Sequence, residues 1–365
     1  DFLLIAGDLF NSALPRLESL KEVSSQLKRL KEHNIPVYVI PGSHDASLSG
    51  QSMLDVLDIA GLITNVMKGT VDENNKLHLS WTIDKKTGVH ITGIKGEKGQ
   101  LEKKYYEQLT PLNMPKNAFS IFMFHSAISQ LQPPELTQMQ SQDVSFLPSG
   151  CSYYAGGHVH ITNTYSSALH KSVVFPGPTF PNNFSELEKL KNGSYVFFDD
   201  SCNPPFSHEK IVLKNVISKT YNADNKTANQ VSEELLEFAN QDFSNSIVLL
   251  RLQGTLRSQK TTDINIQEII QKCYSSQAYI VLTNSYALQG EQFLKEESVL
   301  GETANEIEKE LIKLNSGNHP FLDKKQEEEL IAKLLERNTL EPLDGEKKSS
   351  FVDRIVNEIK EILEK

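Results

Sequence analysis

The stretch YYAGGHVHITN, residues 153–163, decides how the rest of this sequence is interpreted. It begins as an apolar strand, passes through Gly156 and Gly157, and then places His158 and His160 at alternate positions. A histidine pair can arise by chance in a polar turn, so the pair alone does not define a site. If other strands of the chain also end in Asp or His, both imidazoles point instead to a shared metal site.

Comparable apolar strands are predicted over residues 2–6 (FLLIA), 35–42 (IPVYVIPG) and 118–125 (AFSIFMFH). Between the first two, leucines at helical spacing predict a helix over residues 15–33, and a further helix over 52–61 ends at a glycine. Strand and helix therefore alternate along the chain. This alternation predicts an α/β fold whose apolar strands are buried on both faces.

Each of these strands is followed by polar residues that can bind metal or transfer protons. In chain order they are Asp8, Ser43, His44, Asp45, His125, His158 and His160. Taken singly, Asp8 is more simply a turn residue, His125 a core histidine and the 42–45 segment a tight loop. Ligands in open α/β folds gather at the carboxyl ends of strands, and here four segments end in this way. We therefore predict one site to which all four segments contribute.

The residue types in this site suit two-metal hydrolysis of a phosphate ester. Mixed carboxylate and imidazole ligands favour manganese, iron or zinc over calcium. Two divalent ions about 3.5–4 Å apart can polarise a phosphate and generate hydroxide from a bound water near neutral pH. A histidine that does not bind metal can protonate the leaving oxygen.

The ordered motifs GD, GSHD, FH and GHVH resemble those of the calcineurin-like metallophosphoesterase superfamily. Longer stretches such as VIPGSHDASLSGQSMLDVLDIAGL and VVFPGPTFPNNFSELEKLKNGSYVF resemble the archaeal DNA double-strand-break repair nucleases related to bacterial SbcD. The resemblance is strong over residues 1–200 and moderate over 201–290, where SIVLLRLQGTL is similar to the capping domain of that family. It implies an α/β fold: a four-layer β-sandwich core flanked by helices, a smaller α/β capping domain and a helical C-terminal tail.

The same resemblance implies three regions. Residues 1–203 would be the nuclease domain, 204–290 a capping domain that contacts DNA, and 291–365 a helical region. Helices in the last position bind an SMC-like coiled-coil ATPase of the Rad/SbcC type in the family. The polar stretch 199–210 is expected to be a connection out of the first domain.

The resemblance also implies a role for each site residue. Asp8 would bridge two divalent ions, for which manganese is expected. His125 and His158 would bind one ion, and His160 the other. Ser43 stands where the superfamily usually has Asn, so both a ligand role and a non-ligand role stay open for it.

The expected catalytic residues are His44 and Asp45. His44 would be the acid that protonates the leaving 3′ oxygen, and Asp45 would orient His44. The family's D-x-H motif is absent from the sequence, and we expect that the chain begins after it. One ion would then lack two of its ligands.

The predicted function is a metal-dependent DNA exonuclease and endonuclease that processes double-strand breaks with an SMC-like ATPase. Two alternatives stay open: a phosphodiesterase or phosphatase for a small molecule, and a DNA-end-binding scaffold whose catalysis has decayed. A homodimer is implied by the family alone, with residues 51–60 as candidates from position only.

Composition limits the setting in which the protein works. The net charge is −10, which argues against a generally basic nucleic-acid binder. Residues 291–365 carry most of this negative charge, so a basic groove elsewhere in the chain is not excluded. Its three cysteines are far apart and form no CxxC pair, which predicts reduced thiols and a cytoplasmic location. No apolar run reaches the roughly 20 residues that a membrane-spanning helix needs, so no membrane partner is expected.

Overall fold

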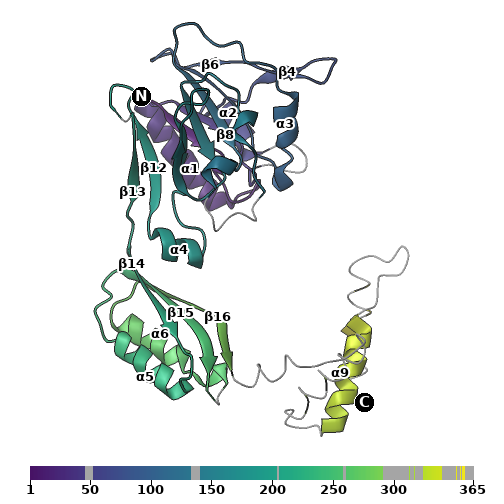
Figure 1. The fold of residues 1–365 in the computed structure, drawn as a ribbon, viewed down its shortest axis with the longest axis vertical. Coiled ribbons are helices and arrows are strands. Elements are labelled where there is room, and N and C mark those ends of the chain that lie inside the picture. Colours follow the sequence, from purple (N-terminus) through teal and green to yellow (C-terminus); the bar gives the residue numbers. More distant parts are fainter. Residues whose placement is uncertain are drawn as a thin grey trace. The chain divides into compact units, whose positions relative to one another are not determined.

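The computed structural model describes residues 1–290 except 46–51, 133–139, 204 and 258–259. Beyond residue 290 it describes the helix at 324–338 and the single residues 312, 316, 351, 354, 356 and 357 (Figure 1). The chain divides into two compact units, Asp1–Val216 and Ile217–Lys365. The predicted site residues all belong to the first unit.

A small parallel sheet opens the first unit. It is formed by β1 (Leu3–Ala6), β2 (Val37–Ile40) and β3 (Thr64–Asn65), in that order. All four residues of β2 are buried, because alternate side chains serve different cores. Val37 and Val39 pack with the helices α1 (Leu17–Glu32) and α2 (Met53–Ile59). Tyr38 and Ile40 pack with the residues of a second sheet.

The second sheet has six strands in the order β10-β11-β9-β8-β7-β6. Their bounds are β6 (Thr82–Ile83), β7 (His90–Ile94), β8 (Ser120–His125), β9 (Tyr153–Gly157), β10 (Thr162–Tyr165) and β11 (Val173–Pro176). Neighbours β7, β8, β9 and β11 are parallel, so their carboxyl ends lie at one edge. Every residue of β8 is buried, as its apolar sequence predicts.

The two sheets pack face to face and helices cover their outer faces (Figure 1). Ile121 and Met123 of β8 share the inner core with Tyr38 and Ile40 of β2. On the outer face of β8, Phe122 and Phe124 pack in a core with residues of α3 (Lys103–Gln108) and the short helical turns η2 (Ser129–Leu131) and η4 (Val144–Phe146). The result is the four-layer α/β sandwich that the resemblance implied.

Shorter elements connect and flank this sandwich. The expected hairpin before β8 is present as β6 and β7, and a second hairpin joins β4 (Gly69–Val71) to β5 (Leu77–Leu79). The turn η1 (Lys98–Gln100) precedes α3. After β11 come α4 (Phe184–Leu190) and the antiparallel pair β12 (Gly193–Phe198) and β13 (Phe206–Ile211).

The expectation that residues 199–210 form only a polar connection is wrong. Five of the six residues of β13 lie in this stretch and pair with β12 inside the first unit. The reason is alternation: Phe206 packs against the inner core, while its neighbours Ser207 and Glu209 are exposed. A half-buried strand of this kind has a polar average composition.

The second unit is a three-stranded sheet backed by two helices. The strand order is β14 (Asn215–Asn222), β15 (Ser246–Leu256) and β16 (Ile280–Gly290). The helices α5 (Ala228–Phe238) and α6 (Ile266–Ser275), with the turn η5 (Thr261–Asp263) before α6, pack on one face of the sheet. Farther along the chain lies α9 (Lys324–Asn338), but most of the expected 291–365 helical region falls outside the described residues.

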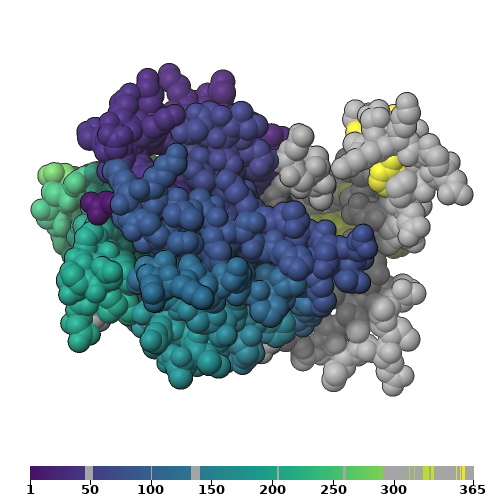
Figure 2. All heavy atoms as spheres, turned by 90° about the horizontal axis from the view of Figure 1, so that it is seen from above, coloured from purple at the N-terminus to yellow at the C-terminus, as the bar shows by residue number. Residues whose placement is uncertain are grey.

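In the space-filling view, the purple N-terminal segments of the first unit lie against the blue segments that follow them in the chain (Figure 2). Inside the unit, β1 contacts β8 and β9 of the second sheet. Among the helices that the structure describes, none has the length and apolar character needed to cross a bilayer.

Candidate metal centre

The carboxyl ends of the two sheets meet at one place. Asp8 follows β1, the 42–45 loop follows β2, His125 ends β8, and His158 follows β9. Glycine makes the close approach possible: a Cβ added at Gly157 would lie 1.9 Å from the Ala6 carbonyl oxygen, far inside contact distance. This is the strand-end site that the sequence predicts.

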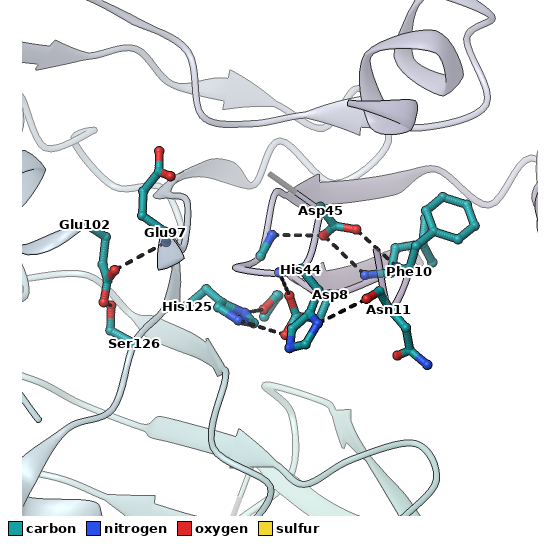
Figure 3. Close-up of polar contacts among 12 residues, drawn as sticks. Asp8, Phe10, Asn11, His44, Asp45, Glu97, Glu102, His125 and Ser126 are labelled. Carbon is teal, nitrogen blue, oxygen red and sulfur yellow. Dashed lines mark hydrogen bonds and ion pairs between the residues drawn. The ribbon is translucent and has the colours of Figure 1, made fainter. Parts of the chain in front are cut away.

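Asp8 and His125 form the centre of the site (Figure 3). His125 is only 2% exposed, and its Nδ1 lies 2.7 Å from the Ala6 carbonyl oxygen. A carbonyl only accepts hydrogen bonds, so Nδ1 carries the proton. The other ring nitrogen, Nε2, lies 3.2 Å from Asp8 Oδ2 without the alignment of a hydrogen bond. A buried imidazole nitrogen and a carboxylate oxygen therefore converge on the same space.

This pair fits a metal ion. A neutral His125 would face the Asp8 carboxylate with a lone pair, which is repulsive unless a cation or a proton lies between them. Two ligands about 2.0–2.2 Å from one ion lie about 2.8–3.6 Å apart at right-angled to tetrahedral geometry. The observed separation of 3.2 Å falls in that range.

The neighbouring groups keep Asp8 ionised. Burial alone would raise the pKa of Asp8, but the His125 ring and the backbone N–H of His44, which donates to Asp8 Oδ1 at 2.8 Å, outweigh burial and lower the pKa. A carboxylate that is charged near neutral pH is the form that binds a divalent ion.

His158 is held as a neutral imidazole beside His125. The two ring centroids are 5.1 Å apart. Burial, with a smaller effect of the His125 charge, lowers the pKa of His158 to about 4. A neutral imidazole is the metal-binding form. Asp8, His44, His125 and His160 all lie close enough to influence the pKa of His158, so the structure brings these five residues near one another.

Asp45 organises the backbone around the site. Its carboxylate accepts hydrogen bonds from the backbone N–H groups of Gly42 (2.9 Å), Phe10 (3.1 Å) and Leu9 (3.3 Å) (Figure 3). Burial outweighs these bonds and raises the pKa of Asp45. The loop after β1 is thereby fixed to the loop after β2. These contacts reach the backbone of both loops, whereas the sequence predicts an Asp45 that orients the His44 ring.

His44 is exposed at the edge of the site. Its Nδ1 lies 3.1 Å from the backbone oxygen of Asn11, so this nitrogen donates a hydrogen bond and Nε2 points away from it. Ser43, just before it, is buried at 8% exposure.

His160 has a partner that sequence analysis did not find. Its Nδ1 lies 3.0 Å from Oε2 of Glu186, a residue of the first turn of α4. Asn183, three residues before Glu186, is the N-cap of α4 and accepts a hydrogen bond from the Glu186 backbone N–H. Asn followed by Glu at this spacing is a helix-start signal, and it could have predicted α4.

The described side chains do not form a complete ligand set. Among the described residues, no three His, Cys, Asp or Glu side chains lie close enough together to hold one ion. What the structure provides is one convergent pair, Asp8 and His125, with His44, His158 and His160 around it.

Comparison with known proteins points the same way. Residues 1–162 match the sequence model of the calcineurin-like phosphoesterase family. A protein of Archaeoglobus fulgidus named DNA double-strand break repair protein Mre11 is 29% identical over 52% of this chain and 43% of its own length. The protein of the same name from Methanococcus maripaludis is 25% identical over 76% of this chain and 68% of its own.

A bacterial relative carries a less specific name. The "uncharacterized metallophosphoesterase YhaO" of Bacillus subtilis is 28% identical over 70% of this chain and 60% of its own length. The chain thus spans between 43% and 68% of the length of these three relatives.

Proposed function

Because residues 1–162 carry a calcineurin-like metallophosphoesterase domain, we propose that the chain hydrolyses phosphodiester bonds of DNA and acts at double-strand breaks. The observation that carries the chemistry is the convergence of Asp8 Oδ2 and His125 Nε2 at the strand ends. The choice of DNA is supported by the archaeal relatives, whose names describe double-strand break repair.

The proposed cofactor is a pair of divalent ions, with manganese expected. Asp8, His125 and His158 would hold one ion, while Asp8 and His160 would hold the other. Ser43 keeps both possible roles. When bound, such ions neutralise phosphate charge and supply hydroxide near neutral pH. The chain contributes an ionised Asp8, whose pKa is lowered by its neighbours, and a neutral His158, whose pKa is lowered by burial.

His44 is the proposed general acid. The Asn11 carbonyl holds its Nδ1–H, which leaves Nε2 to carry a proton to the leaving 3′ oxygen. The exposure of His44 suits contact with a bulky substrate. Asp45 supports this role through the backbone, since its three hydrogen bonds fix the loop that precedes His44.

Partners are proposed from apolar side chains that are exposed or half-buried. Val56 and Ile59 of α2 are 54% and 89% exposed, and a second copy of the chain could cover them in a homodimer. Leu330 and Ile331 of α9 are half-buried, and they lie in the region proposed to bind an SMC-like coiled-coil ATPase. The three free cysteines support a reducing, cytoplasmic setting.

The test is hydrolysis of linear duplex DNA in the presence of Mn²⁺. The wild type is compared with His125→Ala, and His33→Ala serves as the matched control. His33 is an exposed histidine of the same unit whose Nδ1 also contacts a backbone oxygen, that of Arg29. The proposal predicts Mn²⁺-dependent shortening of DNA by the wild type and by His33→Ala, and a loss of at least about 100-fold in His125→Ala.

Two other outcomes would favour the alternatives. Hydrolysis of bis(4-nitrophenyl) phosphate with intact DNA would indicate a phosphodiesterase for small molecules. Binding of DNA ends without hydrolysis of either substrate would indicate a scaffold.

A further inference from the structure

We propose that Glu186 is a positioning residue of the metal centre, which holds the His160 ring with Nδ1 protonated and Nε2 as its metal-binding nitrogen. This role rests on the proposed function of the same site. Glu186 lies 26 residues from His160 in the chain and belongs to a different element, α4. No motif of the metal site includes it.

The tautomer follows from the contact. Oε2 of Glu186 lies 3.0 Å from His160 Nδ1, and an ionised carboxylate can only accept a hydrogen bond. A neutral imidazole has one N–H, so a proton on Nδ1 leaves the lone pair on Nε2. A carboxylate that accepts a hydrogen bond from the other ring nitrogen of a metal-binding histidine also fixes the ring orientation. It increases the basicity of the nitrogen that binds the metal.

Glu186 is itself held in place by its surroundings. Oε2 accepts a hydrogen bond from the backbone N–H of Asn182 at 2.8 Å, and Oε1 accepts one from the Asn183 side-chain amide at 2.8 Å. Asn183 caps the helix through the Glu186 backbone N–H. The carboxylate is therefore anchored at the start of α4 and joins the 182–186 segment to the loop after β9.

The chain offers a matched control for this pair. In the β4–β5 hairpin, His78 Nε2 lies 3.0 Å from Asp72 Oδ2, the same separation as in the Glu186–His160 pair. The hairpin pair is exposed and contains no proposed metal ligand. Asp72→Asn therefore removes a carboxylate from a histidine–carboxylate contact without touching the metal centre.

The experiment measures Mn²⁺ binding by titration calorimetry for wild type, Glu186→Ala, Glu186→Gln and Asp72→Asn. Glu186→Ala is expected to weaken one of the two Mn²⁺ sites about 10–100-fold and to leave the other unchanged. Glu186→Gln should lose less, because its amide oxygen can still accept the Nδ1 hydrogen. Asp72→Asn should bind as the wild type does.

A second measurement needs no metal. ¹⁵N NMR of the histidine rings at pH 8, assigned with a His160→Asn variant, reports which nitrogen of His160 carries the proton. The wild type and Asp72→Asn are expected to have His160 protonated at Nδ1, and Glu186→Ala should have a mixture of both tautomers.

Several results would overturn the proposal. One such result is Mn²⁺ binding at both sites of Glu186→Ala that is as tight as in the wild type. Another is an equal weakening of both Mn²⁺ sites together with a lower melting temperature of the metal-free protein. The latter pattern would mean that Glu186 only stabilises the fold. A wild type that binds no Mn²⁺ would instead overturn the metal centre, and the positioning role with it.

Discussion

Two of the proposed ligands, Asp8 and His158, have backbone φ angles of 53° and 83°. Residues with a side chain rarely adopt such left-handed conformations, which cost on the order of 1–3 kcal/mol each. At Asp8 the carboxylate gains a hydrogen bond from the His44 backbone N–H, which offsets part of that cost. Strain of this kind concentrates at functional sites, because the geometry of the site rather than local preference determines the backbone.

The lowered pKa of His158 predicts a pH dependence for the metal-free protein. The pKa of this ring falls from 6.5 to about 4 on folding, so between these values the unfolded chain binds a proton that the folded chain does not. Stability contributed by neutral His158 is present above pH 6.5 and is lost as the pH falls toward 4. Urea unfolding should therefore show a steeper loss from pH 7 to pH 4.5 in the wild type than in His158→Asn.

Asn is chosen for that substitution because it tolerates a left-handed backbone and does not titrate. Equal pH dependence in the two proteins would contradict the assignment of a neutral, buried His158.

The proton-donor role of His44 can be separated from metal binding with a modified substrate. His44→Ala should slow Mn²⁺-dependent hydrolysis of ordinary DNA about 10²–10⁴-fold, the usual contribution of a general acid. DNA whose 3′ leaving oxygen is replaced by sulfur needs no proton, so the variant should cleave it nearly as fast as the wild type does. A similar loss on both substrates would argue that His44 acts in another way.

The position of a site residue can be predicted from the sequence where that residue ends or directly follows an apolar strand. Asp8, His44, His125, His158 and His160 come together because each of them ends or follows an apolar strand, and such strands can be recognised from composition. Glu186 could not be paired with His160 in this way. Its contact depends on how α4 folds back, which no local pattern specifies.

The element that brings these residues together is the pair of strand ends at β1 and β9. Gly157, the last residue of β9, leaves no room for a side chain beside the Ala6 carbonyl oxygen. Gly157→Ala should therefore lower the free energy of unfolding by about 3 kcal/mol or more, because either strand must shift. Chemical denaturation measures the change.

Gly88→Ala is the control for this substitution. An added Cβ at Gly88 meets no atom within 4 Å, and only the left-handed backbone (φ 72°) opposes it. A cost of about 1–2 kcal/mol is expected there. If Gly157→Ala costs no more than Gly88→Ala, the close approach of β1 and β9 is not a requirement of the fold.

Elements that are apolar on both faces were predictable, and half-buried ones were less so. β2 and β8 are buried along their whole length, and their sequences are almost entirely apolar. β13 alternates between the core and solvent, and its six residues FSHEKI look like part of a polar connection. The start of α4 depends on the Asn183 cap, which is a weaker signal than a run of leucines.

At the scale of the whole molecule, the site lies entirely in the unit Asp1–Val216. Binding of Mn²⁺ should therefore stabilise that unit and leave the unit Ile217–Lys365 unchanged. Calorimetry should resolve two transitions. With Mn²⁺ at 100 times its dissociation constant, about 2.7 kcal/mol of stabilisation should raise the temperature of one transition by about 5–10 °C.

His125→Ala is the control, and neither of its transitions should respond to Mn²⁺. A shift of both transitions in the wild type would place metal binding outside the first unit or couple the two units.

Anomalous diffraction from Mn²⁺-soaked crystals can show whether the ends of both sheets form one metal centre. We expect two anomalous peaks, both within bonding distance of Asp8, one of them at His125 Nε2 and the other at His160 Nε2. Manganese bound only away from these residues, in a protein that still cleaves DNA, would contradict this expectation.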